Sequence, residues 1–309
     1  MRFIILLSVV LAVSSHASAQ NVLVDSVLPR TTDNTINTYN LRHYIFKSDG
    51  AAKNTLVVFI PGTFREPHDY KYMMEQIALL GYHVIGLGYK YDPAINPVCR
   101  PTDDVTCHWR ARMETVDGVN RHTSVSVDAP NSILNRLLKG IQYFANKYPS
   151  AGWSQFYSGS QLQWDKIIVT GHSQGAALAG IIGMEFPVKR VVMLSMMDFL
   201  NSGNIPNWVD NSSKHGIFYE FTHSKDELVP FTKVQLGCDK LGLTQHGSAV
   251  SIDCNTYPFN NTHILYTTYF PSTSQVDKFH NGTTIDSYID DETNYKVSLK
   301  EAIRYLFKD

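Results

Sequence analysis

Short apolar runs alternate with amphipathic stretches along most of this chain. Residues 56–60 and 82–87 are almost wholly apolar, and such short runs predict strands that are buried on both faces. Between them, Asp69 and Gly81 bracket an amphipathic helix, which is predicted by apolar residues at helical spacing: Met73, Ile77 and Leu80. A strand, a helix and a second strand joined by short links predict a parallel pair within one sheet.

The same alternation continues toward the C-terminus, with loop-like insertions at about 89–129 and 231–260. Because no linker interrupts it, we predict a single domain over residues 20–309. Its fold class is α/β, with a mostly parallel central sheet and helices on both faces. The remaining elements are predicted as follows: an outer strand at 38–47, strands at 166–170, 191–194, 217–221 and 263–270, helices at 134–148 and 174–184, and a closing helix marked by Val297, Ala302, Ile303 and Leu306.

Residues 1–19 follow a different pattern from the rest of the chain. A short positive start at Met1-Arg2 precedes an apolar stretch over 3–13, and Ala17-Ser18-Ala19 precedes Gln20. These are the three parts of a secretory signal peptide, and the apolar stretch is too short to span a membrane. We therefore predict a mature chain that begins at Gln20, is secreted to the extracellular space or the periplasm, and carries no membrane anchor.

The balance of charges limits the classes of partner. Lysine and arginine together number 27 against 28 aspartates and glutamates, so the formal net charge is −1 over 309 residues. Such a weak overall field does not attract nucleic acid, and we predict a small molecule as the partner. The sequence leaves the oligomeric state open.

The four cysteines predict two disulfides, because an even count in an exported chain is typical of them. Their spacing favours the local pairs Cys99–Cys107 and Cys238–Cys254, with the two other connectivities left open. The sequence lacks the close cysteine pairs of zinc sites, so we predict no bound metal. Three sequons make the chain a candidate glycoprotein: Asn211, Asn260 and Asn281.

The stretch Gly171-His172-Ser173-Gln174-Gly175 fits the G-x-S-x-G nucleophile elbow, a tight turn from a strand to a helix. A β-branched strand before it and a run of small residues after it are the context that this motif requires. The positions two before and two after the serine approach each other, so both are glycine. The serine hydroxyl is then exposed above the sheet on a strained backbone. His172 is expected to point away from the site and to pack.

On these residues the chain resembles the α/β-hydrolase superfamily, from about residue 56 to the closing helix. Within it the chain is similar to a secreted, largely uncharacterised group of serine hydrolases. That likeness rests on Gly152-Trp153, on WDKIIVTGHSQGAA at 164–177 and on the helix before them. The resemblance implies an α/β-hydrolase fold and the chain order serine, acid, histidine. It implies no substrate.

The superfamily order assigns the acid and the base. Asp226, in THSKDELVP, follows the strand predicted at 217–221 and stands shortly before Val-Pro, as the family's acid usually does. The rival is Asp198, in LSMMDF after the preceding strand, where some lipases keep their acid. The histidine is expected after the last strand, where His280 lies. Three other histidines fit this place less well. His263 begins the last strand, His246 lies in an insertion, and His223 precedes the acid.

Two backbone N–H groups are expected to form the oxyanion hole. One belongs to Gln174, directly after the serine, and the other to Thr63, in the loop after the early strand. That loop reads Pro-Gly-Thr, as in some lipases, where the family often carries His-Gly. Glu114 either contacts substrate or pairs with Arg110 or Arg112 at the surface.

Together these features predict a secreted serine hydrolase that cleaves carboxylic esters through an acyl-enzyme. Ser173 is the predicted nucleophile, His280 the base and Asp226 the orienting acid, and this chemistry needs no cofactor. Two alternatives remain. The same triad can cleave an amide or a peptide, and the chain can be a binding module on an inactive hydrolase fold.

Overall fold

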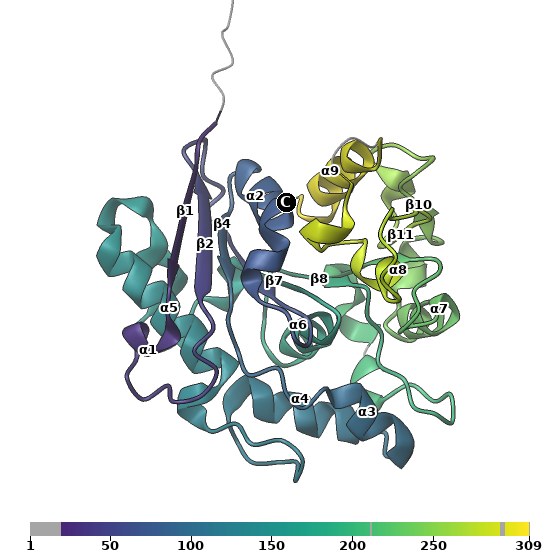
Figure 1. The fold of residues 1–309 in the computed structure, drawn as a ribbon, viewed down its shortest axis with the longest axis horizontal. Coiled ribbons are helices and arrows are strands. Elements are labelled where there is room, and N and C mark those ends of the chain that lie inside the picture. The colour runs from purple at the N-terminus through teal and green to yellow at the C-terminus, as the bar shows by residue number, and fades with distance from the viewer. Residues whose placement is uncertain (1–19, 211, 291–293, 309) are drawn as a thin grey trace, which may run out of the picture.

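A nine-stranded sheet forms the centre of the computed structural model, which describes residues 20–210, 212–290 and 294–308 (Figure 1). The strand order is β1-β2-β4-β3-β7-β8-β9-β11-β10. Strand β2 is antiparallel to both of its neighbours, and every pair from β4 to β10 is parallel. The strands of this sheet are β1 Val22–Val27, β2 His43–Ser48, β3 Leu56–Ile60, β4 His83–Gly86, β7 Ile167–His172, β8 Arg190–Leu194, β9 Phe218–His223, β10 Val250–Ser251 and β11 Ile264–Thr267.

Helices cover both faces of the sheet, with α2 and α9 on one side and α4, α5 and α6 on the other (Figure 1). A separate two-stranded ribbon pairs β5 Tyr157–Ser158 with β6 Gln161–Leu162. The helices are α1 Pro29–Thr32, α2 Lys71–Leu79, α3 Ile95–Cys99, α4 Cys107–Asp117, α5 Ile133–Lys147, α6 Gln174–Glu185, α7 Phe231–Lys240, α8 Lys278–Asn281 and α9 Asn294–Leu306.

Strand β3 explains why its sequence is apolar at every position. Alternate side chains enter different cores: Val58 and Ile60 pack with the α5 and α6 side, and Val57 and Phe59 pack with the α2 and α9 side. All of them are fully buried. A strand with helices on both faces has no solvent side, so it needs no polar alternation.

The strand order and the strand-to-helix turn after β7 are those of an α/β-hydrolase fold. The predicted fold class is therefore confirmed. The strand predicted at 38–47 begins at His43 and is not at the edge of the sheet, because β1 pairs with its outer side. Strand β1 escaped prediction because it is an edge strand that leaves Leu23 and Val24 exposed, so its apolar residues follow no buried pattern.

The two insertions contain regular structure that was not predicted. The segment 89–129 holds α3 and α4, and 231–260 holds α7 and β10. In α4, Arg112 and Glu114 are buried, so charged residues occupy positions where a sequence pattern expects apolar ones. In α7, Gly237 lowers helix propensity but allows close packing, since a Cβ there would lie 2.1 Å from the sulfur of Met197. In α9, Val297 is 66% exposed and does not belong to the buried face.

One of the two predicted disulfides is present. Cys99 and Cys107 are bonded, with their Cα atoms 5.5 Å apart. Cys238 and Cys254 are free thiols, so the second predicted pair is wrong. The reason is their placement: Cys238 belongs to the core-facing side of α7, whereas Cys254 is exposed in the turn after β10. A bond between them would require one side chain to leave its environment.

We expect this thiol pattern to appear in native alkylation followed by peptide mapping. Cys254 should react in the folded protein, and Cys238 should react only after unfolding, because it is fully buried. Cys99 and Cys107 should react only after reduction, and in the chain-entropy account loss of such a short bridge costs about 2–3 kcal/mol of stability. A peptide that joined Cys238 to any other cysteine would contradict the structure.

Candidate active site

Ser173 lies where the backbone turns sharply from β7 into α6. Its φ of 54° and ψ of −123° lie outside the regions that residues other than glycine favour. A Cβ on Gly175 would lie 1.9 Å from the carbonyl oxygen of Ile60 in β3, and a Cβ on Gly171 would lie 2.5 Å from the carbonyl carbon of Gly175. Glycine at both positions therefore allows the turn to pack directly on the end of β3.

His280 in α8 and Asp226 after β9 meet beside this turn. Nδ1 of His280 lies 2.8 Å from Oδ2 of Asp226, and both side chains are buried. The other oxygen of Asp226 accepts the backbone N–H groups of Leu228 and Val229, each at 2.8 Å. We assign the ring proton to Nδ1, which donates to the carboxylate. Nε2 of His280 is then an acceptor, and among the described residues it has no hydrogen-bond partner.

Asp198, the rival acid, is bonded elsewhere. Its carboxylate accepts two hydrogen bonds from Arg112, at 2.6 and 2.9 Å, and one from the indole N–H of Trp208 at 3.0 Å. Burial opposes ionisation of Asp198, but the charges of Arg112 and His108 together with the hydrogen bonds from Arg112 and Trp208 outweigh burial and hold the pKa of the carboxyl below its usual value. Asp198 is therefore part of an internal ion pair.

The other histidines considered from the sequence are also bonded away from Asp226. His263 contacts the carbonyl oxygen of Phe218 through Nδ1 at 2.8 Å, and its ring stacks on His246 at 3.7 Å. His223 contacts the carbonyl oxygen of Tyr269 through Nε2 at 2.6 Å. His280 is the histidine that the structure brings to Asp226.

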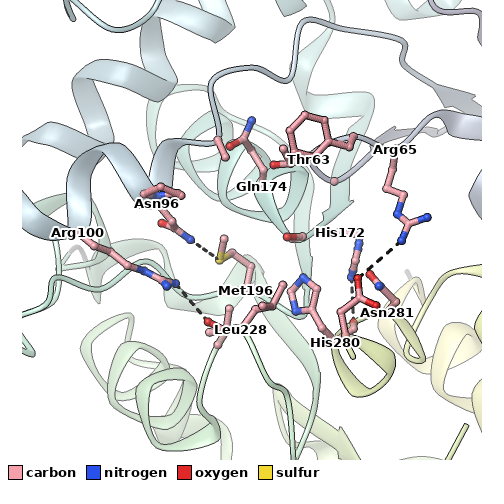
Figure 2. A pocket seen from close by; sticks show the side chains of 17 residues that line it. Thr63, Arg65, Asn96, Arg100, His172, Gln174, Met196, Leu228, His280 and Asn281 are labelled. Carbon is pink, nitrogen blue, oxygen red and sulfur yellow. Dashed lines mark hydrogen bonds and ion pairs between the residues drawn. The ribbon is translucent and has the colours of Figure 1, made fainter. Parts of the chain in front are cut away.

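Ser173, His280 and both predicted oxyanion-hole residues line one pocket of about 530 Å³ (Figure 2). Within the described part of the chain, the backbone N–H groups of Thr63 and Gln174 donate no hydrogen bond to another protein group. Gly62 lies so close to the elbow that a Cβ on it would be 3.2 Å from Cβ of Ser173. The loop after β3 is thus beside the serine, where an oxyanion hole requires it.

A buried chain of hydrogen bonds joins the loop after β3 to His280. The N–H of Gly62 donates to the hydroxyl of Tyr70 at 3.1 Å, and that hydroxyl contacts Nδ1 of His172 at 3.0 Å. Nε2 of His172 lies 3.1 Å from the carbonyl oxygen of His280. A carbonyl oxygen only accepts, so Nε2 of His172 carries the proton and Tyr70 donates to Nδ1. Burial, with the nearby charge of His280, lowers the pKa of His172 well below its usual value, which keeps the ring neutral.

His172 was expected to point away from the site and pack. It is buried, but it also lines the pocket and donates to the carbonyl oxygen of His280 in α8. Sequence reasoning missed two further contacts. The Glu227 carboxylate accepts the backbone N–H of His280 at 2.9 Å and that of the preceding residue at 3.0 Å. The side chain of Gln174 accepts the N–H of Ile95 at 2.8 Å and donates to the carbonyl oxygen of Tyr91, which ties the 89–129 segment to the elbow.

Glu114 fits neither of its two sequence interpretations. It is buried, and its carboxylate accepts the backbone N–H groups of Arg121 and His122 at 2.7 and 2.8 Å. It holds the loop that follows α4, and it does not line the pocket. This role of Glu114 could not be predicted from the sequence, because both of its partners are backbone groups, which every residue type except proline carries.

The sequons differ in exposure. Asn281 is 3% exposed and lines the pocket, so its side chain has no room for a glycan in the folded chain. Asn260 is exposed. Asn211 lies outside the described residues.

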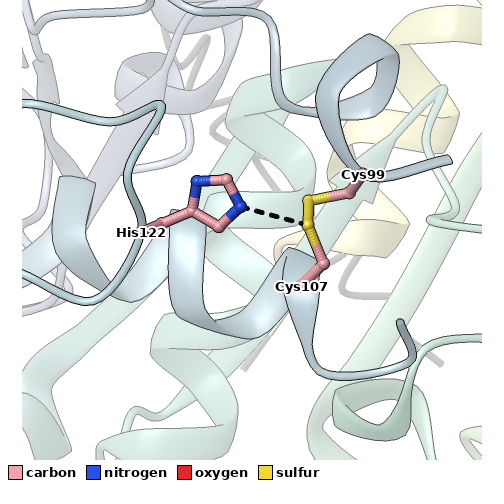
Figure 3. A group of neighbouring side chains, drawn as sticks. All are labelled: Cys99, Cys107 and His122. Carbon is pink, nitrogen blue, oxygen red and sulfur yellow. Dashed lines mark hydrogen bonds between the residues drawn. A yellow bond between two sulfur atoms is a disulfide. The ribbon is translucent and has the colours of Figure 1, made fainter. Parts of the chain in front are cut away.

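Among the described residues, one group brings three potential metal ligands within reach of one another: Cys99, Cys107 and His122 (Figure 3). Both sulfurs belong to the disulfide, and Nε2 of His122 lies 3.3 Å from the sulfur of Cys107. A disulfide sulfur is not a thiolate, so this group does not fit a metal.

No helix in the described ranges is long and apolar enough to cross a membrane.

No protein-family model matches this chain, and no curated protein matches its sequence. Among solved structures, the chain is similar to the protein from Klebsiella pneumoniae subsp. pneumoniae that bears the name "Putative Dienelactone Hydrolase". The two are 12% identical, the match covers 94% of this chain and 100% of that one, and the TM-score is 0.46. With a score this low, the fold assignment depends on the strand order and the elbow instead.

We expect Tyr70→Phe to lower kcat about tenfold with a smaller change in KM. The substitution removes the hydroxyl that accepts from Gly62 and donates to His172, so two buried partners lose their bonds, at about 1–3 kcal/mol each. Steady-state kinetics together with thermal unfolding would measure both effects.

Tyr305→Phe is the matched control for this substitution. Its hydroxyl donates to the carbonyl oxygen of Thr262 at 2.7 Å, away from the pocket. It should lower stability and leave kcat unaltered. Equal losses of kcat in the two variants would mean that Tyr70 acts through stability alone.

Proposed function

We propose that this chain is a secreted serine hydrolase that cleaves carboxylic esters. The observation that carries the proposal is the buried 2.8 Å contact between His280 and Asp226, with the second ring nitrogen unpartnered in the pocket that Ser173 lines. A serine becomes a nucleophile when a neighbouring base takes its proton and an acid orients that base. The strained conformation of Ser173 at the elbow supports the same role.

The reaction follows from these positions. Oγ of Ser173 attacks the ester carbonyl carbon while its proton passes to Nε2 of His280, and Asp226 stabilises the imidazolium through Nδ1. The carbonyl oxygen becomes an oxyanion that accepts the N–H groups of Thr63 and Gln174. When the carbon–oxygen bond to the alcohol breaks, Nε2 returns the proton to the alcohol and an acyl-enzyme remains.

Water releases the acyl group by the same route in reverse. His280 takes a proton from the water as its oxygen attacks the acyl carbon, and the proton then passes to Oγ of Ser173 as the ester bond breaks. The products are a carboxylic acid and the free enzyme. No step requires a cofactor. The same residues could act on an amide, and a matched ester and anilide would separate the two reactions.

Export is part of the proposal, with residues 1–19 removed as a signal peptide. The disulfide between Cys99 and Cys107 supports it, because disulfides persist in oxidising compartments. Asn211 and the exposed Asn260 are then the sequons open to a glycan. The peptide map that locates the disulfide also gives the N-terminus, which we expect at Gln20.

We expect a fluorescent phosphonate to label the wild-type protein at Ser173 and to leave Ser173→Ala unlabelled. The phosphonate reacts only with an activated serine, so labelling tests the nucleophile without knowledge of the substrate. Ser173→Ala should also lose turnover of a 4-nitrophenyl ester while its thermal unfolding stays cooperative. A folded wild-type protein that resists the phosphonate would favour a binding module on an inactive fold.

We expect Asp226→Asn to lower kcat by about 10³–10⁴-fold, because an amide cannot hold the imidazole in its tautomer or stabilise its charge. Asp198→Asn is the contrasting variant. It should lower stability by a few kcal/mol, since Arg112 stays buried with a weakened partner, and the folded fraction should keep its turnover. Kinetics and denaturant unfolding of both variants would check this. If Asp198→Asn had the greater loss of kcat, the acid would have to be reassigned.

A further inference from the structure

One wall of the pocket carries a guanidinium that has no ion-pair partner in the part of the chain that the structure describes. Arg100, at the end of α3, lines the pocket and is partly buried. Its Nη2 makes a long contact of 3.5 Å to the carbonyl oxygen of Leu228. If the Asn96 amide is turned so that its nitrogen donates to Asp198, the amide oxygen accepts from the same Nη2 at 3.2 Å. Nε of Arg100 is buried with no partner among the described residues.

The guanidinium is held in place without being neutralised. Its carbon lies 3.8 Å from the ring centre of Phe199, so the aromatic ring covers one face of the group. Stacking of this kind leaves the N–H groups at the edge of the guanidinium, which is where a carboxylate binds. Neither of the groups that Nη2 contacts, Leu228 and Asn96, carries a charge.

The carboxylates behind this wall are bonded to groups other than Arg100. Arg100 and Arg112 supply two positive charges, and Asp198 supplies one negative charge, which is already committed to Arg112 in a 2.6 Å ion pair. His108 adds no charge at neutral pH, because burial lowers its pKa to about 4. The next carboxylate, Asp226, is within electrostatic reach of Arg100 but makes its contacts to His280 and to backbone N–H groups. Among the described residues, Arg100 therefore has no carboxylate in direct contact.

The opposite wall is different. Arg65 also lines the pocket, but its Nη2 lies 3.9 Å from the carboxylate of Asp277 and 3.3 Å from the hydroxyl of Tyr288. Figure 2 shows Arg65 and Arg100 on opposite sides of His280. Of these two cations, only the one at Arg100 lacks a carboxylate partner.

We propose that Arg100 binds a carboxylate group of the substrate, so that the preferred esters are anionic ones. Apolar side chains line the same pocket and suit a short hydrocarbon body between the ester and the charge: Phe64, Ala94, Pro97, Met196 and Val229. A carboxylate there would pair with the guanidinium through charge-assisted hydrogen bonds. This inference rests on the proposed esterase function and adds the class of substrate.

Two matched pairs of esters test the proposal. In the first pair the acyl side carries the charge: mono-4-nitrophenyl glutarate is compared with its neutral carbamoyl analogue. In the second pair the alcohol side carries it: 4-acetoxybenzoate is compared with 4-acetoxybenzamide. We expect kcat/KM for the anionic member of at least one pair to exceed that of its neutral partner about tenfold or more. Arg100→Met should abolish that preference, and Arg100→Lys should keep part of it.

Arg110→Met is the control for the change in net charge. Arg110 is on α4, pairs with Asp104 at the surface and does not line the pocket, so its loss should leave the preference unchanged. If neither pair favours its anionic member, or if the preference survives in Arg100→Met, the proposal is wrong. Phosphonate labelling of Ser173 in the same preparations shows whether the esterase function itself holds.

A binding measurement tests the site without turnover. Benzoate should raise the Tm of the wild-type protein more than benzamide does, and that difference should vanish in Arg100→Met and persist in Arg110→Met. Equal shifts with both ligands in the wild-type protein would overturn the proposal even if no ester were cleaved.

Discussion

The close packing of the elbow on strand β3 is the constraint on which the rest of the site depends. A Cβ at Gly175 would lie 1.9 Å from the carbonyl oxygen of Ile60, so this turn can approach the strand only with glycine there. The same approach places Gly62 next to Ser173 and sets the oxyanion loop beside the serine. The unfavourable backbone of Ser173, with φ of 54°, costs about 1–3 kcal/mol and persists because the sheet on both sides of β7 holds it.

Hydrogen bonds then fix the segments that the sheet alone would leave free. Helix α8 is held by Glu227, which accepts the N–H groups of Phe279 and His280, and by His172, which donates to the carbonyl oxygen of His280. Tyr70 connects His172 to the loop after β3, so Gly62 and the backbone of His280 belong to one buried network of hydrogen bonds. Such a network is rigid only while every member is satisfied, which is why we expect loss of one hydroxyl to affect kcat more than KM.

The parts of the site that were predictable have local signatures. The elbow needs glycines at fixed offsets from Ser173, and the order of chain segments points to Asp226 and His280, whose side chains the structure brings into contact. The parts that were not predictable depend on contacts between distant segments. Tyr70 meets His172 across 102 residues and Glu227 meets His280 across 53, and neither pair leaves a periodic pattern. Helix α4 was not predicted, and the predicted Cys238–Cys254 disulfide is wrong, for a related reason. Burial follows from tertiary packing, which spacing along the chain does not encode.

Asp198, the rival acid that follows β8, also affects the electrostatics of the pocket. Asp198 could have oriented a histidine from there, but Arg112 holds it in a buried ion pair, and a charge so desolvated requires a partner to stay ionised. Asp198 is committed to Arg112. Arg100 is the second guanidinium on that side, it has no ion pair of its own among the described residues, and its position at the pocket wall leaves it open to solvent or substrate. The structural use of Asp198 and the inferred preference for anionic esters therefore have the same electrostatic origin.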